Sequence, residues 1–232
     1  MEQQLGLDLP VETRFGREDF LVSPSNETAY ALFDSWPQWP DHVQLLLGPT
    51  GAGKSHLATI WATRTGAQII AARDLTLERL PALVAGATLL VEDADRAQGR
   101  DAELFHLLNL ARAAGCWLVM TARSWPDSWG LATADLLSRL RLAPASEIAE
   151  PDDALVRAVL VKLFVDRQLT VDTSVVDYLA LRIDRSLGAA RAIVAALDKQ
   201  ALARRKPVTR PMAADVLRMM SEQAHDSAQE PA

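Results

Sequence analysis

The chain has 232 residues, of which 49% are hydrophobic, and its formal net charge is -6. This length allows one sizeable α/β core and a small second domain, and the acidic balance argues against a surface built mainly to neutralise nucleic-acid phosphates. A single cysteine, Cys116, excludes a disulfide framework within one chain. No apolar run reaches the length of a membrane span and no secretory signal opens the sequence, so we expect a cytoplasmic protein that contacts no membrane.

The first strong signal is a phosphate-binding loop. Residues 48–55 read GPTGAGKS, a complete G-x-x-x-x-G-K-[ST] pattern between the apolar run Val43–Leu47 and a helix-forming segment at 56–64. Glycines allow tight turns that aim backbone N–H groups at an anion, and the following helix adds the positive end of its dipole. The alternative is a glycine-rich turn that binds nothing. The predicted nucleotide contacts are Gly48, Pro49, Thr50, Gly51, Ala52, Gly53, Lys54, Ser55 and His56.

Strand-like and helix-like periods alternate after this loop. Residues 68–70, 88–91 and 116–121 are typical of buried strands, whereas 75–84 and 101–114 have helical periodicity. Together with the strand before the loop, they predict a parallel, doubly wound sheet of four strands. The ligand crevice of such a sheet lies at the carboxyl ends of its strands.

From Pro151 onward the pattern indicates helices only. We expect helices over 152–167, 173–183, 187–203 and 211–220, with Asp172 as an N-cap. The predicted fold class is therefore an α/β P-loop core over 15–148 followed by a small all-helical lid over 149–220. The polar residues 221–232 are predicted to be a disordered tail.

Two acids end the third predicted strand. Leu89–Asp93 reads LLVED, a form that phosphoryl-transfer ATPases use to hold Mg²⁺ and to orient the attacking water. By position, Glu92 together with the Ser55 hydroxyl would bind the metal, and Asp93 would act on the water as the catalytic base. The alternative is an acidic strand-end cap without catalysis.

Tryptophans and the cysteine favour structural roles. SWPQWP at Ser35 and SWPDSW at Ser124 are short loops whose indoles either pack onto their own domain, which we favour, or contact a partner. Cys116 opens an apolar segment and is expected to be a packed core thiol. The basic residues Arg204, Arg205, Lys206 and Arg210 are interpreted as a solvated helix terminus.

Several segments together resemble a known family. The segment from Phe15 to Asn26 resembles the entry strand of the bacterial replication initiator DnaA, and GAGKSHL, LLVEDAD and the Leu137–Leu140 segment LSRL are also similar to DnaA. The chain ends after the lid, so over residues 4–220 it looks like a member of the Hda family of short DnaA-related AAA+ proteins. That resemblance implies an AAA+ fold, ADP or ATP with Mg²⁺ as cofactors, and DnaA and the DNA polymerase III sliding clamp (beta subunit) as partners. It implies that the chain stimulates hydrolysis of DnaA-bound ATP, so restrains replication initiation, and contacts DNA only through the clamp. The resemblance leaves open whether the chain forms a homo-oligomer.

The first 14 residues resemble the family's extended clamp-binding segment. Gln4 is followed by Leu5, Leu7 and Leu9, and this alternation places the three leucines on one side of an extended strand. They could fill an apolar pocket while the Gln4 amide forms hydrogen bonds. A docked N-terminal strand of the chain's own fold would look the same.

The arginine of the LSRL segment is the second residue whose role comes from the resemblance. In this family it is supplied in trans to the nucleotide of a neighbouring subunit, which makes Arg139 the catalytic candidate. A guanidinium stays charged and contacts two oxygens at once, so it suits this task. Arg141 is a competitor, and a structural ion pair is the alternative role for Arg139.

Two departures from the DnaA pattern bear on the chain's own ATPase activity. The polar or acidic sensor after the fourth strand is replaced by Thr121, Ala122 and Arg123, and the usual lid arginine aligns with Gly188. Arg185 and Arg191 lie one turn to either side and are predicted nucleotide contacts, as is Thr121. We hypothesise weak or absent autonomous hydrolysis and an ADP-stabilised switch.

Two other classes of function stay open. The chain could be an autonomous AAA+ ATPase, such as a helicase loader or remodelling factor, whose own hydrolysis drives a conformational cycle. A small-molecule kinase using the same loop is less compatible with the helical lid.

Overall fold

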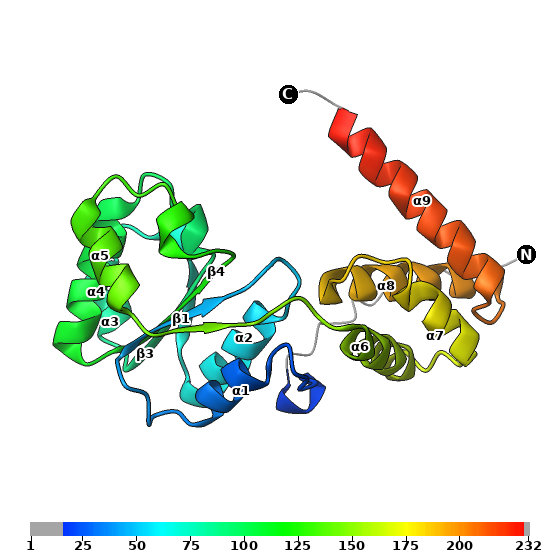
Figure 1. The fold of residues 1–232 in the computed structure, drawn as a ribbon, viewed down its shortest axis with the longest axis horizontal. Coiled ribbons are helices and arrows are strands. Elements are labelled where there is room, and N and C mark those ends of the chain that lie inside the picture. Colours follow the sequence, from blue (N-terminus) through cyan, green and yellow to red (C-terminus); the bar gives the residue numbers. More distant parts are fainter. Residues whose placement is uncertain (1–15, 230–232) are drawn as a thin grey trace, which may run out of the picture.

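The computed structural model describes residues 16–229 and consists of an α/β part and a helical part (Figure 1). The α/β part is built on one parallel sheet of five strands in the order β2-β3-β4-β1-β5. The strands are β1 (Val43–Leu47), β2 (Gln68–Ala71), β3 (Thr88–Glu92), β4 (Trp117–Ala122) and β5 (Ala145–Glu147). Because all five run the same way, their carboxyl ends meet at one edge, as expected for this class of sheet.

Helices cover both faces of the sheet because its central strands are apolar on both sides. Every residue of β1 is buried; Leu45 and Leu47 pack on one face and Leu46 on the other. The face of Leu46 is covered by α1 (Glu27–Asp34) and α2 (Lys54–Thr65). The opposite face is covered by α3 (Leu80–Val84), α4 (Asp101–Ala114) and α5 (Ala134–Leu142).

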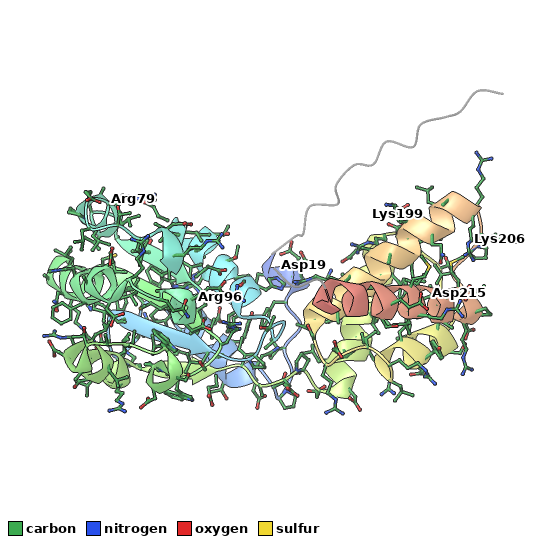
Figure 2. All side chains as sticks on the ribbon, turned by 90° about the horizontal axis from the view of Figure 1, so that it is seen from above. Asp19, Arg79, Arg96, Lys199, Lys206 and Asp215 are labelled. Atoms are coloured by element: carbon green, nitrogen blue, oxygen red, sulfur yellow. The ribbon has the colours of Figure 1, made fainter. Side chains whose placement is uncertain are left out.

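The helical part has its own apolar core. It consists of α6 (Asp153–Asp166), α7 (Thr173–Ala180), α8 (Leu187–Arg204) and α9 (Arg210–Gln229), and residues of all four form one buried cluster. The helix starts are capped as the residue types predict: the Asp152 carboxylate accepts from the Leu155 N–H, and that of Asp172 from the Ser174 N–H. We call this part the lid; Figure 2 shows it on the far side of Asp19 from the sheet.

Several elements differ from the sequence predictions. The sheet has a fifth strand, β5, and helices α1 and α5 lie in segments where no helix was predicted. The prediction of an entry strand before Asn26 is wrong for residues 16–26. There, residues 17–19 form a 3-10 helix (η1, Arg17–Asp19) that is followed by a loop. The helix expected over 75–84 is shorter and occupies only Leu80–Val84. Helix α9 continues through Gln229, into the segment expected to be disordered.

The predicted structural roles of most tryptophans and of the cysteine are confirmed. Trp36, Trp39, Trp61 and Trp117 contact one another through stacked and edge-to-face rings beside α2. Cys116 is 1% exposed. In the second loop Trp129 is buried, whereas Trp125 is half exposed and donates from its indole N–H to Glu147.

Over residues 16–229, none of the helices is both long and apolar enough to span a bilayer. The segment predicted to bind the clamp, Gln4 with Leu5, Leu7 and Leu9, lies outside the described residues.

Candidate functional site

The phosphate loop connects β1 to α2 at the carboxyl edge of the sheet, where its glycines are sterically required. Gly51 has φ +78, and a Cβ there would lie 1.9 Å from the Ser186 hydroxyl oxygen of the lid. Gly48 has φ +149, and a Cβ there would lie 2.2 Å from the Ile148 carbonyl oxygen. Side chains at these positions would displace the loop from the structures on either side of it.

Lys54 is held inside the loop that precedes it. Its ammonium donates to the carbonyl oxygens of Gly48, at 2.6 Å, and Pro49, at 2.9 Å, and the residue is 8% exposed. Burial lowers the pKa of Lys54, while the carboxylates of Asp93 and Asp95 act in the opposite direction. An ammonium has three N–H bonds, so one remains for a phosphate oxygen.

Ser55 and Glu92 meet as expected for a metal site. The Ser55 hydroxyl donates to one carboxylate oxygen of Glu92 at 3.1 Å, whereas the other, Oε1, is buried and has no hydrogen-bond partner. Burial raises the pKa of Glu92. A buried carboxylate oxygen without a partner is costly, and hydroxyl and carboxylate oxygens are the ligands that Mg²⁺ prefers. The two residues therefore fit a magnesium ion bound together with phosphate, although residues 16–229 contain no cluster of three or more His, Cys, Asp or Glu able to hold a metal.

Asp93 follows directly in a left-handed backbone conformation. Its φ is 55, its N–H donates to the buried Thr121 hydroxyl at 3.1 Å, and its carboxylate lies 3.6 Å from Arg96. Left-handed non-glycine residues cost free energy and are frequent at functional sites. Thr121 thus orients the backbone of the candidate base, a role that the sequence did not predict for it.

One pair of side chains at this edge was missed entirely. Asp95 belongs to the 3-10 helix η3 (Ala94–Arg96) after β3, and Arg123 follows β4. The Asp95 carboxylate is 6% exposed and accepts from the Arg123 Nε at 2.7 Å and from the Arg123 backbone N–H at 3.3 Å. The available signal was opposite charges just after two strands that neighbour each other in the sheet.

A cavity of about 680 Å³ lies between the α/β part and the lid. Its lining includes Phe20, Leu21 and His56 from the α/β part, and Leu187 and Arg191 from α8. His56 is 5% exposed, contacts the Phe20 ring edge-on, and has its pKa lowered by burial. Such a volume and mixed lining suit a small organic ligand.

The lid contacts the phosphate loop directly, and the two candidate arginines lie differently with respect to the cavity. The Leu187 N–H, at the start of α8, donates to the Gly51 carbonyl at 2.9 Å. Arg191 faces the cavity one turn into α8, and burial lowers its pKa. Arg185 instead forms an ion pair with Asp153 at 3.0 Å and is 63% exposed. Of the two, only Arg191 lines the cavity.

A second link between the α/β part and the lid lies at the cavity wall. Lys162 of α6 donates to the Asp19 carboxylate of η1 at 2.6 Å, and these side chains are 26% and 13% exposed. The Lys162 ammonium lowers the pKa of Asp19. Figure 2 shows Asp19 where the two parts of the molecule meet.

Comparison with solved structures identifies the architecture. Domain III of the Thermotoga maritima replication initiation protein DnaA matches with a TM-score of 0.75 at 18% identity, over 90% of this chain and 98% of that chain. The fold is that of an AAA+ P-loop NTPase. The Thermotoga maritima RuvB Holliday junction branch migration motor matches at 0.69 and 13% identity, over 89% of this chain and 72% of that chain. AMPPCP-bound DnaA from Aquifex aeolicus matches at 0.65 and 19% identity, over 79% and 64%.

No protein-family model and no curated protein sequence matches the chain. The predicted fold class, an AAA+ α/β core with a parallel sheet followed by a helical lid, is confirmed by these structural matches.

Arg139 lies on α5, on the side of the AAA+ sheet opposite α2. Its guanidinium contacts Asp135 at 3.3 Å, donates to the Asn109 amide oxygen at 2.8 Å and lies over the Phe105 ring. The side chain is 36% exposed. These three partners belong to α4 and α5, so all of these contacts of Arg139 lie on its own side of the sheet.

Arg141, the competitor on the same helix, pairs with Asp127 of the 3-10 helix η4 (Pro126–Ser128) and is 57% exposed. That pairing raises the pKa of the already basic guanidinium. The two arginines therefore differ in partners but are both accessible at the surface.

Proposed function

We propose that the chain binds an adenine nucleotide, ADP or ATP, with Mg²⁺ between its AAA+ core and lid. The observation that carries this is the phosphate loop with its Ser55–Glu92 pair, bonded through Gly51 to the start of α8, next to a cavity that His56 and α8 line. Similar solved structures bind nucleotides: AMPPCP in DnaA from Aquifex aeolicus, and ADP in an AAA domain that matches at a TM-score of 0.61.

Each residue has a distinct task in this complex. Lys54 and the loop N–H groups bind the phosphates, Ser55 and Glu92 hold the metal, and the core–lid cavity takes the base and sugar. When bound, Mg²⁺ neutralises charge on the phosphate oxygens. Asp93 orients a water, and Arg191 senses the nucleotide from the lid.

We further propose that this nucleotide complex is a DnaA-related adaptor. In this proposal residues 1–14 bind the sliding clamp through Gln4, Leu5, Leu7 and Leu9, and Arg139 stimulates hydrolysis of ATP bound to DnaA. Support comes from the DnaA-like fold, the resemblance of those segments to the Hda family, and the location of Arg139 away from the chain's own phosphate loop.

The present contacts of Arg139 are compatible with that role. An exposed ion pair is worth about 0–1 kcal/mol and an exposed cation–π contact about 0.5–1 kcal/mol. An arginine supplied in trans can accelerate phosphoryl transfer by about 10³ to 10⁵, equivalent to about 4–7 kcal/mol. The hydrogen bond to Asn109 adds about 1.5–3 kcal/mol. Redirecting the guanidinium from Asp135, Phe105 and Asn109 to a neighbouring nucleotide therefore costs less than the upper end of that gain.

An autonomous AAA+ ATPase is the second candidate. It is favoured by one observation, the ordered group of Glu92, Asp93 and Thr121 at the chain's own phosphate loop. Under this alternative the chain's hydrolysis is fast without DnaA, and residues 1–10 are dispensable for its activity.

One experiment separates these functions. ATP bound to DnaA is followed through a single turnover with the native chain, with and without DNA-loaded clamp, and then with Arg139→Ala, Arg141→Ala or a chain lacking residues 1–10. The adaptor requires clamp-dependent stimulation that Arg139→Ala and the deletion abolish and Arg141→Ala retains. Equal stimulation by native and Arg139→Ala chains rejects the role of Arg139, and rapid clamp-independent hydrolysis of free ATP by the chain alone supports the alternative.

A further inference from the structure

The end of the lid remote from the sheet carries a cluster of positive charges. Residues 204–210, from the last residue of α8 to the first of α9, read RRKPVTR, with four arginines and lysines and no aspartate or glutamate. Figure 2 shows Lys206 at the opposite end of the molecule from Arg79 of the α/β part. Because the whole chain has a formal charge of -6, this cluster is a local exception to its acidic balance.

The protein does not neutralise these charges. The side chains of Arg205 and Lys206 are exposed and form neither an ion pair nor a hydrogen bond with any residue of the described part of the chain. Arg204 lies 4.0 Å from the Asp215 carboxylate of α9, and Arg218 lies 3.3 Å from the same group. One carboxylate therefore serves two guanidiniums, and a net positive charge remains on the surface of the turn.

Arg210 and a second arginine, Arg182, share one aromatic ring beside this turn. Their guanidinium carbons lie 4.9 and 4.0 Å from the centroid of the Tyr178 ring, and both residues are exposed. Neither has a carboxylate partner among the described residues; the Arg182 side chain donates to the Tyr178 carbonyl oxygen. The ring attracts each cation, so Tyr178 holds two like charges close together without cancelling them. A bound anion would relieve their mutual repulsion.

The chemistry of this surface fits the backbone of a nucleic-acid duplex. A guanidinium contacts two oxygens of a phosphate with parallel hydrogen bonds, and a duplex presents its phosphates in closely spaced rows. A bilayer is a poorer match, because the apolar faces of α7, α8 and α9 are packed into the lid core. An unpaired base needs an aromatic ring on which to stack, and that of Tyr178 is already occupied by Arg182 and Arg210.

We propose that this basic end of the lid, formed by Arg182, Arg204, Arg205, Lys206 and Arg210, binds the phosphate backbone of duplex DNA without reading its sequence. Phosphate contacts supply affinity but carry no sequence information. The inference is independent of the proposed nucleotide site, because the core–lid cavity is lined by other residues. It replaces two expectations from sequence: that this cluster is only a solvated helix terminus, and that the chain contacts DNA only through the clamp.

The test is a titration of the full chain into a short fluorescent DNA duplex, followed by anisotropy at several salt concentrations. Near physiological salt the dissociation constant should lie at about 10⁻⁴ to 10⁻⁶ M, and a duplex of scrambled sequence should bind equally. With about five phosphate contacts, the logarithm of the binding constant should fall with the logarithm of the salt concentration with a slope of about -4 to -5.

Two double variants with the same change in net charge locate the binding surface. Arg205→Glu combined with Lys206→Glu should weaken binding at low salt by about tenfold or more and make the salt slope shallower by about two. Arg73→Glu combined with Arg79→Glu replaces two exposed arginines of the α/β part, and it should change the affinity by less than about twofold because salt screens distant charges. Unfolding temperatures show that each variant is folded before its titration is interpreted.

Binding that the lid variant loses and the α/β variant keeps supports the inference. The absence of binding by the native chain at low salt overturns it, and so do equal losses in the two double variants, because these would reflect net charge alone. A DNA single strand, or vesicles of phosphatidylserine and phosphatidylcholine, bound more tightly than the duplex through Arg205 and Lys206 would overturn the assignment of duplex DNA as the ligand.

Discussion

The carboxyl edge of the sheet and the α4–α5 surface both carry charged residues, but the protein satisfies those charges differently. At the sheet edge Lys54 is buried among backbone carbonyls and Glu92 keeps a buried oxygen without a partner. On the α4–α5 surface, the exposed Arg139 and Arg141 each have a carboxylate partner. Desolvated, incompletely satisfied groups are stabilised by a ligand that pairs with them, whereas solvated ion pairs are stable without one.

The structure of a single chain therefore says more about the ligand of the sheet edge than about the partner of the α4–α5 surface. The sheet edge carries desolvated groups whose cost the phosphate and the cation of the proposed ligand would offset. The α4–α5 surface carries no such cost, so its partner enters through the proposal that Arg139 acts on another subunit. The following changes test the sheet edge and its links to the lid, in order of expected effect.

The largest effect should follow Lys54→Met. This change removes a desolvated charged donor from the phosphate loop while keeping the aliphatic stem, so affinity for Mg·ADP should fall by about 100-fold, or about 3 kcal/mol. Isothermal titration measures it. Lys199→Met, at an exposed lid lysine labelled in Figure 2, should leave the affinity unchanged, and native affinity in Lys54→Met would show that the loop does not bind phosphate.

Gly51→Ala should loosen the lid. Its Cβ would lie 1.9 Å from the Ser186 hydroxyl oxygen at φ +78, so the phosphate loop and the start of α8 must separate. We expect a loss of about 1–3 kcal/mol in unfolding free energy, together with weaker nucleotide binding. Gly115→Ala is the matched control, because Gly115 has φ +68 and a Cβ there would meet nothing within 4 Å; equal losses in both variants would mean that the lid contact contributes nothing.

Glu92→Gln should reduce the gain in nucleotide affinity that Mg²⁺ provides by about tenfold. It should also stabilise the nucleotide-free chain, because a charged buried group is removed. Because burial raises the folded pKa of Glu92, its protonated form favours the fold below pH 4.5 and this contribution is lost as pH rises through the folded pKa. The variant should therefore unfold at a higher temperature than the native chain at pH 7 and lack that pH dependence. Glu103→Gln removes a carboxylate paired with Arg100 and should not stabilise; a stability loss in Glu92→Gln would contradict the unsatisfied state of its carboxylate.

The smallest effect is expected at the link between Asp19 and Lys162. The lowered pKa of Asp19 means that its stabilising contribution is present above pH 3.8 and is lost as pH falls through the folded pKa. Asp19→Asn should cost up to about 1 kcal/mol at pH 7, measured by denaturant unfolding. Asp166→Asn removes the other carboxylate bound by Lys162, within α6, and serves as control; an equal effect would mean that bridging the two parts is unimportant.

Long apolar or amphipathic segments were predictable from sequence, because burial of their side chains repeats with the period of the element. Helix α4 begins and ends at the predicted residues, Asp101 and Ala114, and β1 matches its apolar run. Strand β5 has only three residues, ASE, and pairs with β1 alone. Because it contains no apolar run, the sequence did not predict it.

Within the site, local pattern identified the loop and the Ser55–Glu92 pair but not the contacts made across the fold. The choice of Arg191 over Arg185 depends on where α8 starts and which side faces the cavity. The bond between Asp95 and Arg123 depends on β3 and β4 being neighbours. Both facts follow from tertiary structure and not from spacing along the chain.

Hydrogen exchange with and without Mg·ADP tests most directly the central claim that nucleotide is held between the phosphate loop and the lid. Bound ligand stabilises the groups that it contacts, so amides of residues 48–55 and of the first turns of α8 should both become protected. Protection in neither segment at saturating nucleotide, or in the loop without α8, would contradict the claim.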